Sequence, residues 1–330
     1  MRNVVSRLAS SIILFWIVLT ITFLLVRAAP GDPTTLLVPP GATADDQARL
    51  RTELGLDAPL VIQYARWAGR LFKGDLGESF VRRAPVRVVL SEAIPVSLGL
   101  GALSLALTFV LGIAIGMYQA ARQGTLSDRA LTIAATTVYA APSFWLALAL
   151  IATFTYGAAR WGFPAPLRLP AFGMRDPASD AAGLAALGDL ARHAVLPVLT
   201  LSAIGAAGIA RYARTITADL IAQDFVRAAR AKGVPRARVY ARHVLANAWP
   251  PLVVLLALAI PGLLAGSVFV EGVFAWPGMG RVTLAAVAAR DYPVILGATA
   301  VYAAAVILAN LAADLALPLL DPRRRSDGST

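Results

Sequence analysis

Long apolar stretches alternate with short polar ones along the whole chain. A helix needs about 20 apolar residues to cross the hydrocarbon core of a membrane, and six stretches without Asp, Glu, Lys or Arg reach or approach that length. The fourth stretch is the shortest, so we expect it to extend into its flanks, with Arg211 or Arg214 reaching the membrane surface. The six predicted spans are Leu8–Val26, Ala93–Ala121, Ala130–Ala159, His193–Ala210, Val244–Val270 and Tyr292–Ala313.

Two of these stretches raise questions of their own. The first is longer than the apolar region of about 7–15 residues that is typical of a cleaved signal peptide, so we expect a retained helix. The third contains Pro142 followed by Ser143. No His or carboxylate lies near Ser143 in the sequence, so a proline kink inside a continuous span is the favoured interpretation.

The polar segment 30–91 is predicted to fold outside the hydrocarbon core. Thr43 suits a helix N-cap, Asp45 and Asp46 suit the first turn, and Gly55 suits the end, which predicts a helix over Thr43–Leu54. A second helix is predicted over Val61–Phe72.

The charge distribution predicts an orientation. Segment 211–243 carries eight Lys or Arg against two acids, whereas segment 160–192 carries four Arg against three Asp. Because basic loops stay in the cytoplasm, we expect both termini there, in a multi-pass protein of the bacterial inner membrane. The composition agrees: the chain is 58% hydrophobic, with a mean hydropathy of +0.68 and a net charge of +11. Glu271 and Asp291 are expected to be interfacial charges.

Several kinds of chemistry have no candidate residues. The chain has no cysteine and only two histidines, His193 and His243, so no catalytic residue, cofactor site or metal site is predicted. Both lysines, Lys73 and Lys232, are followed by Gly rather than Ser or Thr, which excludes a P-loop. No acid lies in the middle of a predicted span, which disfavours a proton relay. We therefore expect no enzyme activity in this chain.

The most informative polar segment follows the fourth span. Asp224 is a candidate N-cap for a short amphipathic helix over Phe225–Lys232. Gly233 suits the left-handed residue that ends a helix, and Pro235 prevents continuation. A solvated basic loop is one interpretation of this pattern. The other is a docking surface, in which small residues admit another protein and the charges set the register.

This segment also resembles a known family. Residues Arg227-Ala228-Ala229-Arg230-Ala231-Lys232-Gly233 resemble the "EAA" loop of ABC importer permeases, with Arg227 in place of Glu and without the family's downstream Ile-x-Leu-Pro. Further blocks between residues 30 and 323 resemble the B-type subunit of the dipeptide, oligopeptide and nickel branch. They include Pro30-Gly31-Asp32-Pro33, Gly74-Asp75-Leu76-Gly77, Phe274-x-Trp276-Pro277-Gly278 and Asp321-Pro322-Arg323.

The resemblance implies an all-α polytopic membrane protein with six transmembrane helices and the type I ABC importer permease fold. Its parts would be an N-terminal cytoplasmic end with the first transmembrane helix (1–29), an extracytoplasmic segment (30–91), a core of five spans (92–322) with a cytoplasmic coupling loop (211–249), and a disordered cytoplasmic tail (323–330). The chain would form a translocation path for peptides or similar solutes. Its partners would be a second, C-type permease, two cytoplasmic ATPase subunits, an extracytoplasmic solute-binding protein and membrane lipid; nucleic acid is not expected.

The implied functional residues are mechanical contacts. Those that would contact an ATPase are Asp224, Arg227, Ala228, Ala229, Lys232 and Gly233. A second group would line the path or form an outer loop, although a plain turn explains it equally well: Glu271, Trp276, Pro277, Gly278 and Gly280. Dipeptides or oligopeptides lead as substrates, and nickel chelates, glutathione and sugars stay open. The alternative is a secondary transporter or channel that needs no ATPase.

Overall fold

The computed structural model describes residues 2–38, 41–180, 182–260, 262 and 268–320. The chain forms two compact units, one from Met1–Ser97 and Pro277–Leu308 and the other from Leu98–Trp276 and Ala309–Thr330. The first unit therefore takes residues 92–97 and one late segment, Pro277–Leu308, that the sequence analysis assigned to the core. Within the described ranges the structure is helical, apart from one isolated bridge between Glu78 and Pro85. The predicted tail 323–330 lies outside these ranges.

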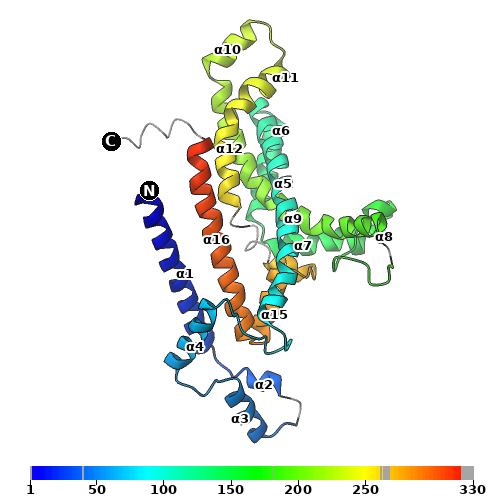
Figure 1. The fold of residues 1–330 in the computed structure, drawn as a ribbon. Helices are drawn as coiled ribbons and strands as arrows, with labels where there is room; N and C mark the ends of the chain where they lie inside the picture. Colours follow the sequence, from blue (N-terminus) through cyan, green and yellow to red (C-terminus); the bar gives the residue numbers. More distant parts are fainter. Residues whose placement is uncertain (1, 39–40, 181, 261, 263–267, 321–330) are drawn as a thin grey trace. The chain divides into compact units, whose positions relative to one another are not determined.

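In the described ranges, seven helices contribute to the first unit, and two of them continue into the second. They are α1 (Arg2–Ala28), α2 (Thr34–Leu37), α3 (Ala44–Glu53), α4 (Leu60–Phe72), α5 (Val86–Ala121), α15 (Met279–Ala288) and α16 (Tyr292–Leu320). Their labels are given in Figure 1. The two helices predicted in segment 30–91 are confirmed. Thr43 caps α3 in a capping box with Asp46, as its position before two acids indicates.

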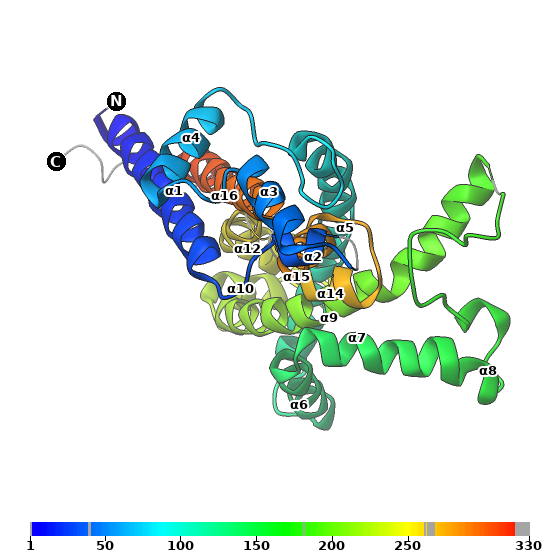
Figure 2. The ribbon, with the colours of Figure 1, turned by 90° about the horizontal axis from the view of Figure 1, so that it is seen from below.

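Helix α4 packs against α1 and the start of α16, as both ribbon views show (Figures 1 and 2). Trp67 of α4 stacks on Phe23 of α1 with ring centroids 5.3 Å apart, and the hydroxyls of Tyr64 and Thr20 lie 2.7 Å apart. Leu296 of α16 completes this cluster. Segment 30–91 is thus attached to a membrane-spanning helix by aromatic side chains.

A buried carboxylate holds the loop after α4. Asp291 is 3% exposed and accepts hydrogen bonds from the Ser79 hydroxyl and from the backbone N–H groups of Phe80 (3.1 Å) and Val81 (3.3 Å). Asp291 directly precedes α16 at the end of a span, but its side chain is buried in the protein instead of lying on its surface. Burying a charge is costly unless hydrogen bonds satisfy it, and here three donors do so.

The remaining elements belong to the second unit. They are α6 (Leu126–Ala140), α7 (Ser143–Ile151), η1 (Ala152–Gly157), α8 (Ala158–Arg160), η2 (Ala165–Leu167), α9 (Leu184–Ile221), α10 (Asp224–Ala231), α11 (Arg236–Arg238), η3 (Val239–Val244), α12 (Leu245–Ala259) and α14 (Val268–Val273). Helices α6, α7, α12 and α14 all pack against α9, which is the central helix of this unit.

Glycines bring α5 and α9 close together. A Cβ atom at Gly116 would lie 2.5 Å from the Ala210 carbonyl oxygen and 2.6 Å from the Ala213 Cβ, and one at Gly112 would lie 2.6 Å from the Ile209 Cβ. Small residues four positions apart allow this approach, and close packing replaces the hydrophobic effect as the attraction between helices in lipid.

Among the described residues, five helices are long and apolar enough to span a membrane, and a bent pair raises the number to six if it is taken as one span. The bent pair is the predicted third span, where continuity through Pro142 is wrong. Helices α6 and α7 meet at 107° because Ala141 is extended (ψ 135°), as residues before proline prefer. The five helices are Ala9–Ala28, Val86–Ala121, Leu184–Ile221, Arg236–Ala259 and Tyr292–Ala312.

Two other spans differ in length from the prediction. The fourth extends into its flanks as expected, but to 38 residues, because Arg192, Arg211 and Arg214 lie within a continuing helix. The fifth was predicted to reach Val270, whereas α12 ends at Ala259. Pro261 and residues 263–267 of that predicted span lie outside the described residues.

We expect Gly116→Ala to destabilise the chain by about 1–3 kcal/mol, because the added methyl group has to separate two packed backbones. The matched control is Gly99→Ala in the same helix, where a Cβ would meet nothing within 4 Å. That change should be neutral or slightly stabilising. The measurement is unfolding of the purified chain in mixed SDS micelles. Equal midpoints for the two variants would contradict the close contact.

Candidate functional site

The connection between α9 and α12 contains the predicted short helix. Helix α10 covers Asp224–Ala231, one residue earlier than predicted, and its N-cap is Gln223, which makes no side-chain capping bond. The assignment of Asp224 as N-cap is therefore wrong. Asp224 is the first helical residue and pairs with Arg227 one turn later. Its negative charge is favourable at this position because the N-terminal end of the helix dipole is positive.

Helix α10 has one packed face and one open face. Val226 (0% exposed) and Ala229 (8%) are buried against Val239 and Val244 in a small apolar cluster. The open face holds the other predicted contact residues, all exposed: Asp224, Arg227, Ala228, Lys232 and Gly233. Of the two alanines in the motif, Ala229 therefore holds the helix in place and Ala228 faces outward.

Gly233 ends the helix in the left-handed conformation, with φ +77°. A Cβ atom there would meet nothing within 4 Å, so the space beside it is open. The chain then turns at Pro235 into α11 and the π-helical segment η3 before α12 begins. Such π-helical turns inside longer helices occur frequently at functional sites.

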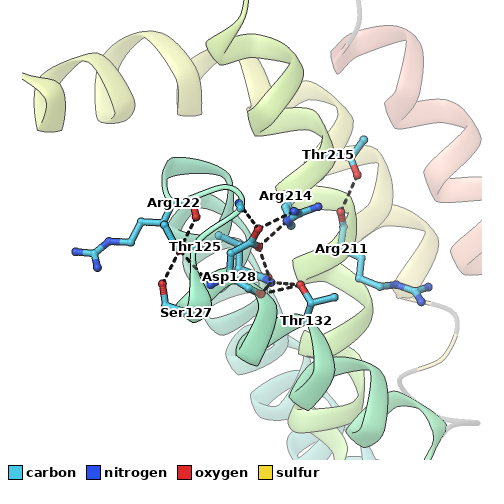
Figure 3. A network of polar contacts seen from close by, with 10 residues as sticks. Arg122, Thr125, Ser127, Asp128, Thr132, Arg211, Arg214 and Thr215 are labelled. Carbon is cyan, nitrogen blue, oxygen red and sulfur yellow. Dashed lines mark hydrogen bonds and ion pairs between the residues drawn. The ribbon is translucent and has the colours of Figure 1, made fainter.

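A polar network anchors the end of α9 that leads into this connection (Figure 3). Asp128 of α6 is 3% exposed and receives two parallel hydrogen bonds from Arg214 of α9, with Nε to Oδ1 and Nη2 to Oδ2 both 2.9 Å. The pair is bidentate, the strongest geometry for arginine and carboxylate. Arg214 precedes Asp224 by ten residues, so the anchor lies two to three helical turns before α10.

Other polar groups complete the shell of Asp128. The backbone N–H of Gly124 donates to Oδ2 at 3.0 Å. The Gln119 amide, at the end of α5, donates to Thr132 at 2.9 Å and lies 3.4 Å from Oδ1 of Asp128. The network thus joins α5, the turn after it, α6 and α9. Sequence analysis missed this site, because Asp128 at the third position after the cap Thr125 matches an ordinary helix start.

The predicted outer group is spread over two helices. Glu271 in α14 is fully buried inside the protein. Trp276 is 3% exposed, and its Nε1 has no hydrogen-bond partner among the described residues. Pro277 is exposed and Gly278 is the N-cap of α15. Gly280 is buried in the first turn of that helix, so only part of this group forms a loop.

Ser97 was another residue that sequence analysis did not single out. Its hydroxyl accepts a 2.8 Å hydrogen bond from the backbone N–H of Met279, the first residue of α15. A side chain from α5 thus satisfies one of the free N–H groups at that helix start. Nothing in the local sequence pattern indicates a cap supplied from 182 residues away.

The residues that the structure describes contain no cluster of three or more His, Asp or Glu side chains positioned to hold a metal ion. The polar groups of the site are instead arginines, hydroxyls and single carboxylates on helices.

Two family descriptions together cover nearly all of the sequence. "Binding-protein-dependent transport system inner membrane component" matches residues 112–326, and its N-terminal counterpart matches residues 1–101. A putative peptide permease protein of Brucella ovis is 38% identical, with 91% of this chain and 92% of the relative covered. The oligopeptide transport system permease AppB of Bacillus subtilis is 33% identical (97% and 98%), and OppB of Mycobacterium tuberculosis is 35% identical (98% and 99%).

Among solved structures, a chain of the MetNI methionine ABC transporter in an inward-facing conformation matches with a TM-score of 0.49 and 17% identity. The match covers 71% of this chain and 97% of that one.

We expect Asp128→Asn to destabilise the chain by about 1–3 kcal/mol, less than for a fully buried pair, because the Arg214 side chain is 33% exposed and water can solvate part of the freed charge. The control is Asp224→Asn, whose pair with Arg227 is mostly exposed and should contribute nothing measurable. Unfolding in mixed SDS micelles measures both variants. A loss at Asp224 as large as at Asp128 would show that the anchor has no special role.

Proposed function

Because this chain belongs to the family of binding-protein-dependent transport system inner membrane components, we propose that it is the membrane-spanning permease subunit of an ABC importer for di- or oligopeptides, with α10 as the helix that couples it to a separate ATPase. The observation that carries the coupling role is the two-faced geometry of α10. One face is fixed to the chain's own apolar cluster and the other is open.

Peptides are favoured as the transported class by the relatives. Several carry peptide or oligopeptide permease in their names and match this chain over more than nine-tenths of its length. The match includes both family regions, so it is not limited to a shared core. Selection among individual peptides would lie with the separate binding protein.

The exposed face of α10 suits a groove on another protein. Ala228 and Gly233 have little or no side chain, which lets a partner surface approach closely, while Arg227 and Lys232 supply positive charge at its edges. Exposed ion pairs contribute only about 0–1 kcal/mol each. The shape around Ala228 and Gly233 would therefore matter more than the charges.

Coupling also requires that movement of α10 reaches the spans. ATP binding and hydrolysis would bias two conformations of the ATPase pair, and α10 would follow the ATPase subunit that holds it. The Asp128–Arg214 pair joins α9 to α6, so a displacement of α10 would move these helices together. The π-helical segment η3 would take up part of the change on the α12 side.

The remaining partners follow from the same proposal. A homologous C-type permease would complete the translocation path, two ATPase subunits would bind on the cytoplasmic side, and a solute-binding protein would dock outside. Both termini would be cytoplasmic, because segment 211–243 carries the largest excess of Lys and Arg. Glu271, Trp276, Pro277, Gly278 and Gly280 would lie near the outer end of the path.

Segment 30–91 would form part of the docking surface for the solute-binding protein, but deleting both of its longer helices, α3 and α4, would not test this role. Helix α4 is held to α1 by Trp67, so its loss would expose apolar surface and confuse misfolding with loss of docking. Helix α3 is the better candidate for contact with a binding protein, because it has no buried residue.

We expect Gly233→Trp to abolish peptide-stimulated ATP hydrolysis in the reconstituted complex, while the variant chain still inserts into the membrane. The side chain would point into open space in the isolated chain and would clash only with a seated ATPase. Gly233→Asn should retain most activity, because asparagine tolerates positive φ. Gly162→Trp is the matched control, with φ +71° and equally open surroundings outside the connection.

The measurement is ATPase activity in proteoliposomes with and without binding protein and peptide. Normal stimulation in Gly233→Trp would remove α10 as the coupling helix. Uptake by the chain alone, with no ATPase bound, would instead favour the alternative of a secondary transporter.

A further inference from the structure

A cavity of about 670 Å³ lies within the first unit, among the end of α1, the end of α3, α4, the loop 76–83 and the start of α16. Five cationic side chains line it: Arg27, Arg66, Arg70, Lys73 and Arg83. Two carboxylates, Glu53 and Glu78, also line it. None of the five cations forms an ion pair with another residue of the described chain, so the cavity has a net positive charge of three that favours an anion.

Arg27 is the cation most constrained by its surroundings. Its guanidinium carbon lies 5.5 Å from the ring centre of Phe23 and 5.1 Å from that of Tyr292, so aromatic rings cover it. Its Nε is buried and has no hydrogen-bond partner in the part of the chain that the structure describes. Buried donors in folded proteins nearly always have an acceptor, and an anion in the cavity would supply one.

Gln63 requires a hydrogen-bond donor, whereas Arg27 requires an acceptor. Its amide nitrogen donates to the backbone carbonyls of Leu56 (3.1 Å) and Ala58 (2.6 Å), which fixes the orientation of the amide. Its Oε1 is buried without a donor among the described residues. A ligand that satisfies both groups carries an anion for Arg27 and a hydroxyl or other donor for Gln63.

The position of the cavity defines the ligand further. Arg27 is the last residue but one of α1, and Tyr292 is the first residue of α16, so the cavity lies where two spans leave the hydrocarbon core. Helix α4 exposes Leu60, Val61 and Phe72 (52%, 78% and 75%). Phe72 stacks on Trp16, which lies about 18 Å back along α1 from its end. The side of α4 that carries Phe72 therefore extends to the depth of acyl chains.

We propose that this cavity binds the headgroup of an anionic phospholipid. Arg27 and Arg70, which both line the cavity, would hold the phosphate, and Gln63 would accept from a headgroup hydroxyl such as those of phosphatidylglycerol. The acyl chains would run along the outward side of α4 and α1. This site is separate from the transport path and from α10, and its occupancy does not depend on any ATPase partner.

The test is native mass spectrometry of the purified full chain after delipidation, titrated with phosphatidylglycerol or with phosphatidylcholine of the same acyl chains. We expect at least about tenfold tighter retention of phosphatidylglycerol, because its hydroxyls pair with Gln63 and it lacks the choline cation that the basic cavity repels. Equal retention of the two lipids would overturn the proposal. Inorganic phosphate at millimolar concentration is a further arm, and full displacement of the lipid by phosphate would identify a soluble anion as the ligand instead.

Two variants connect the binding to the cavity. Arg27→Gln with Arg70→Gln should lose the preference, whereas Arg49→Gln with Arg82→Gln removes the same charge outside the cavity and should retain it. Unchanged preference in the first pair would overturn the assignment.

Gly69→Leu blocks the cavity without changing any charge. Gly69 lines the cavity on α4, a Cβ there would meet nothing within 4 Å, and leucine favours helix more than glycine does. The variant should fold normally and lose the lipid preference. Gly188→Leu, on an open position of α9, is its control. Retention of the preference in Gly69→Leu would place the lipid elsewhere.

Discussion

The bidentate pair between Asp128 and Arg214 is the interaction on which the proposed coupling depends. In lipid the hydrophobic effect contributes little to the association of helices, so specific polar contacts and close packing have to hold them together. At this point α6, the end of α5 and α9 meet around one carboxylate that is almost fully buried. The contact lies where α9 approaches the exposed connection, so in the proposed mechanism a displacement of α10 would reach the long helices.

The close approach at Gly112 and Gly116 complements the ion pair. Glycines bring the backbones of α5 and α9 together around Gly112 and Gly116, and the polar network joins the two helices near their ends. Helix α10 depends on both, because its apolar cluster includes Leu220 and Ile221 at the end of α9. In the proposed mechanism, α10 can transmit a displacement to the spans only because the face opposite its exposed side is packed against the chain.

The first unit uses a different combination of forces. Aromatic stacking attaches α4 to α1, and Asp291 gathers the loop after α4 through three hydrogen bonds. This packing leaves a basic cavity at the ends of two spans. Segment 30–91 is therefore packed against two of the spans. In the proposed site, the cations that it contributes to the cavity would bind the lipid headgroup.

The sequence by itself determined most of the helices that are long and apolar enough to span a membrane, the helix in the connection and its end at Gly233, because apolar length and positive φ are local properties. Only the tertiary structure decided that Asp128 pairs with Arg214, that Ala229 faces inward and that Asp291 is buried. Each of these depends on a partner far away in the chain, or on which side of a helix faces its neighbour. The pattern of residue types along a local segment of sequence does not specify such pairings.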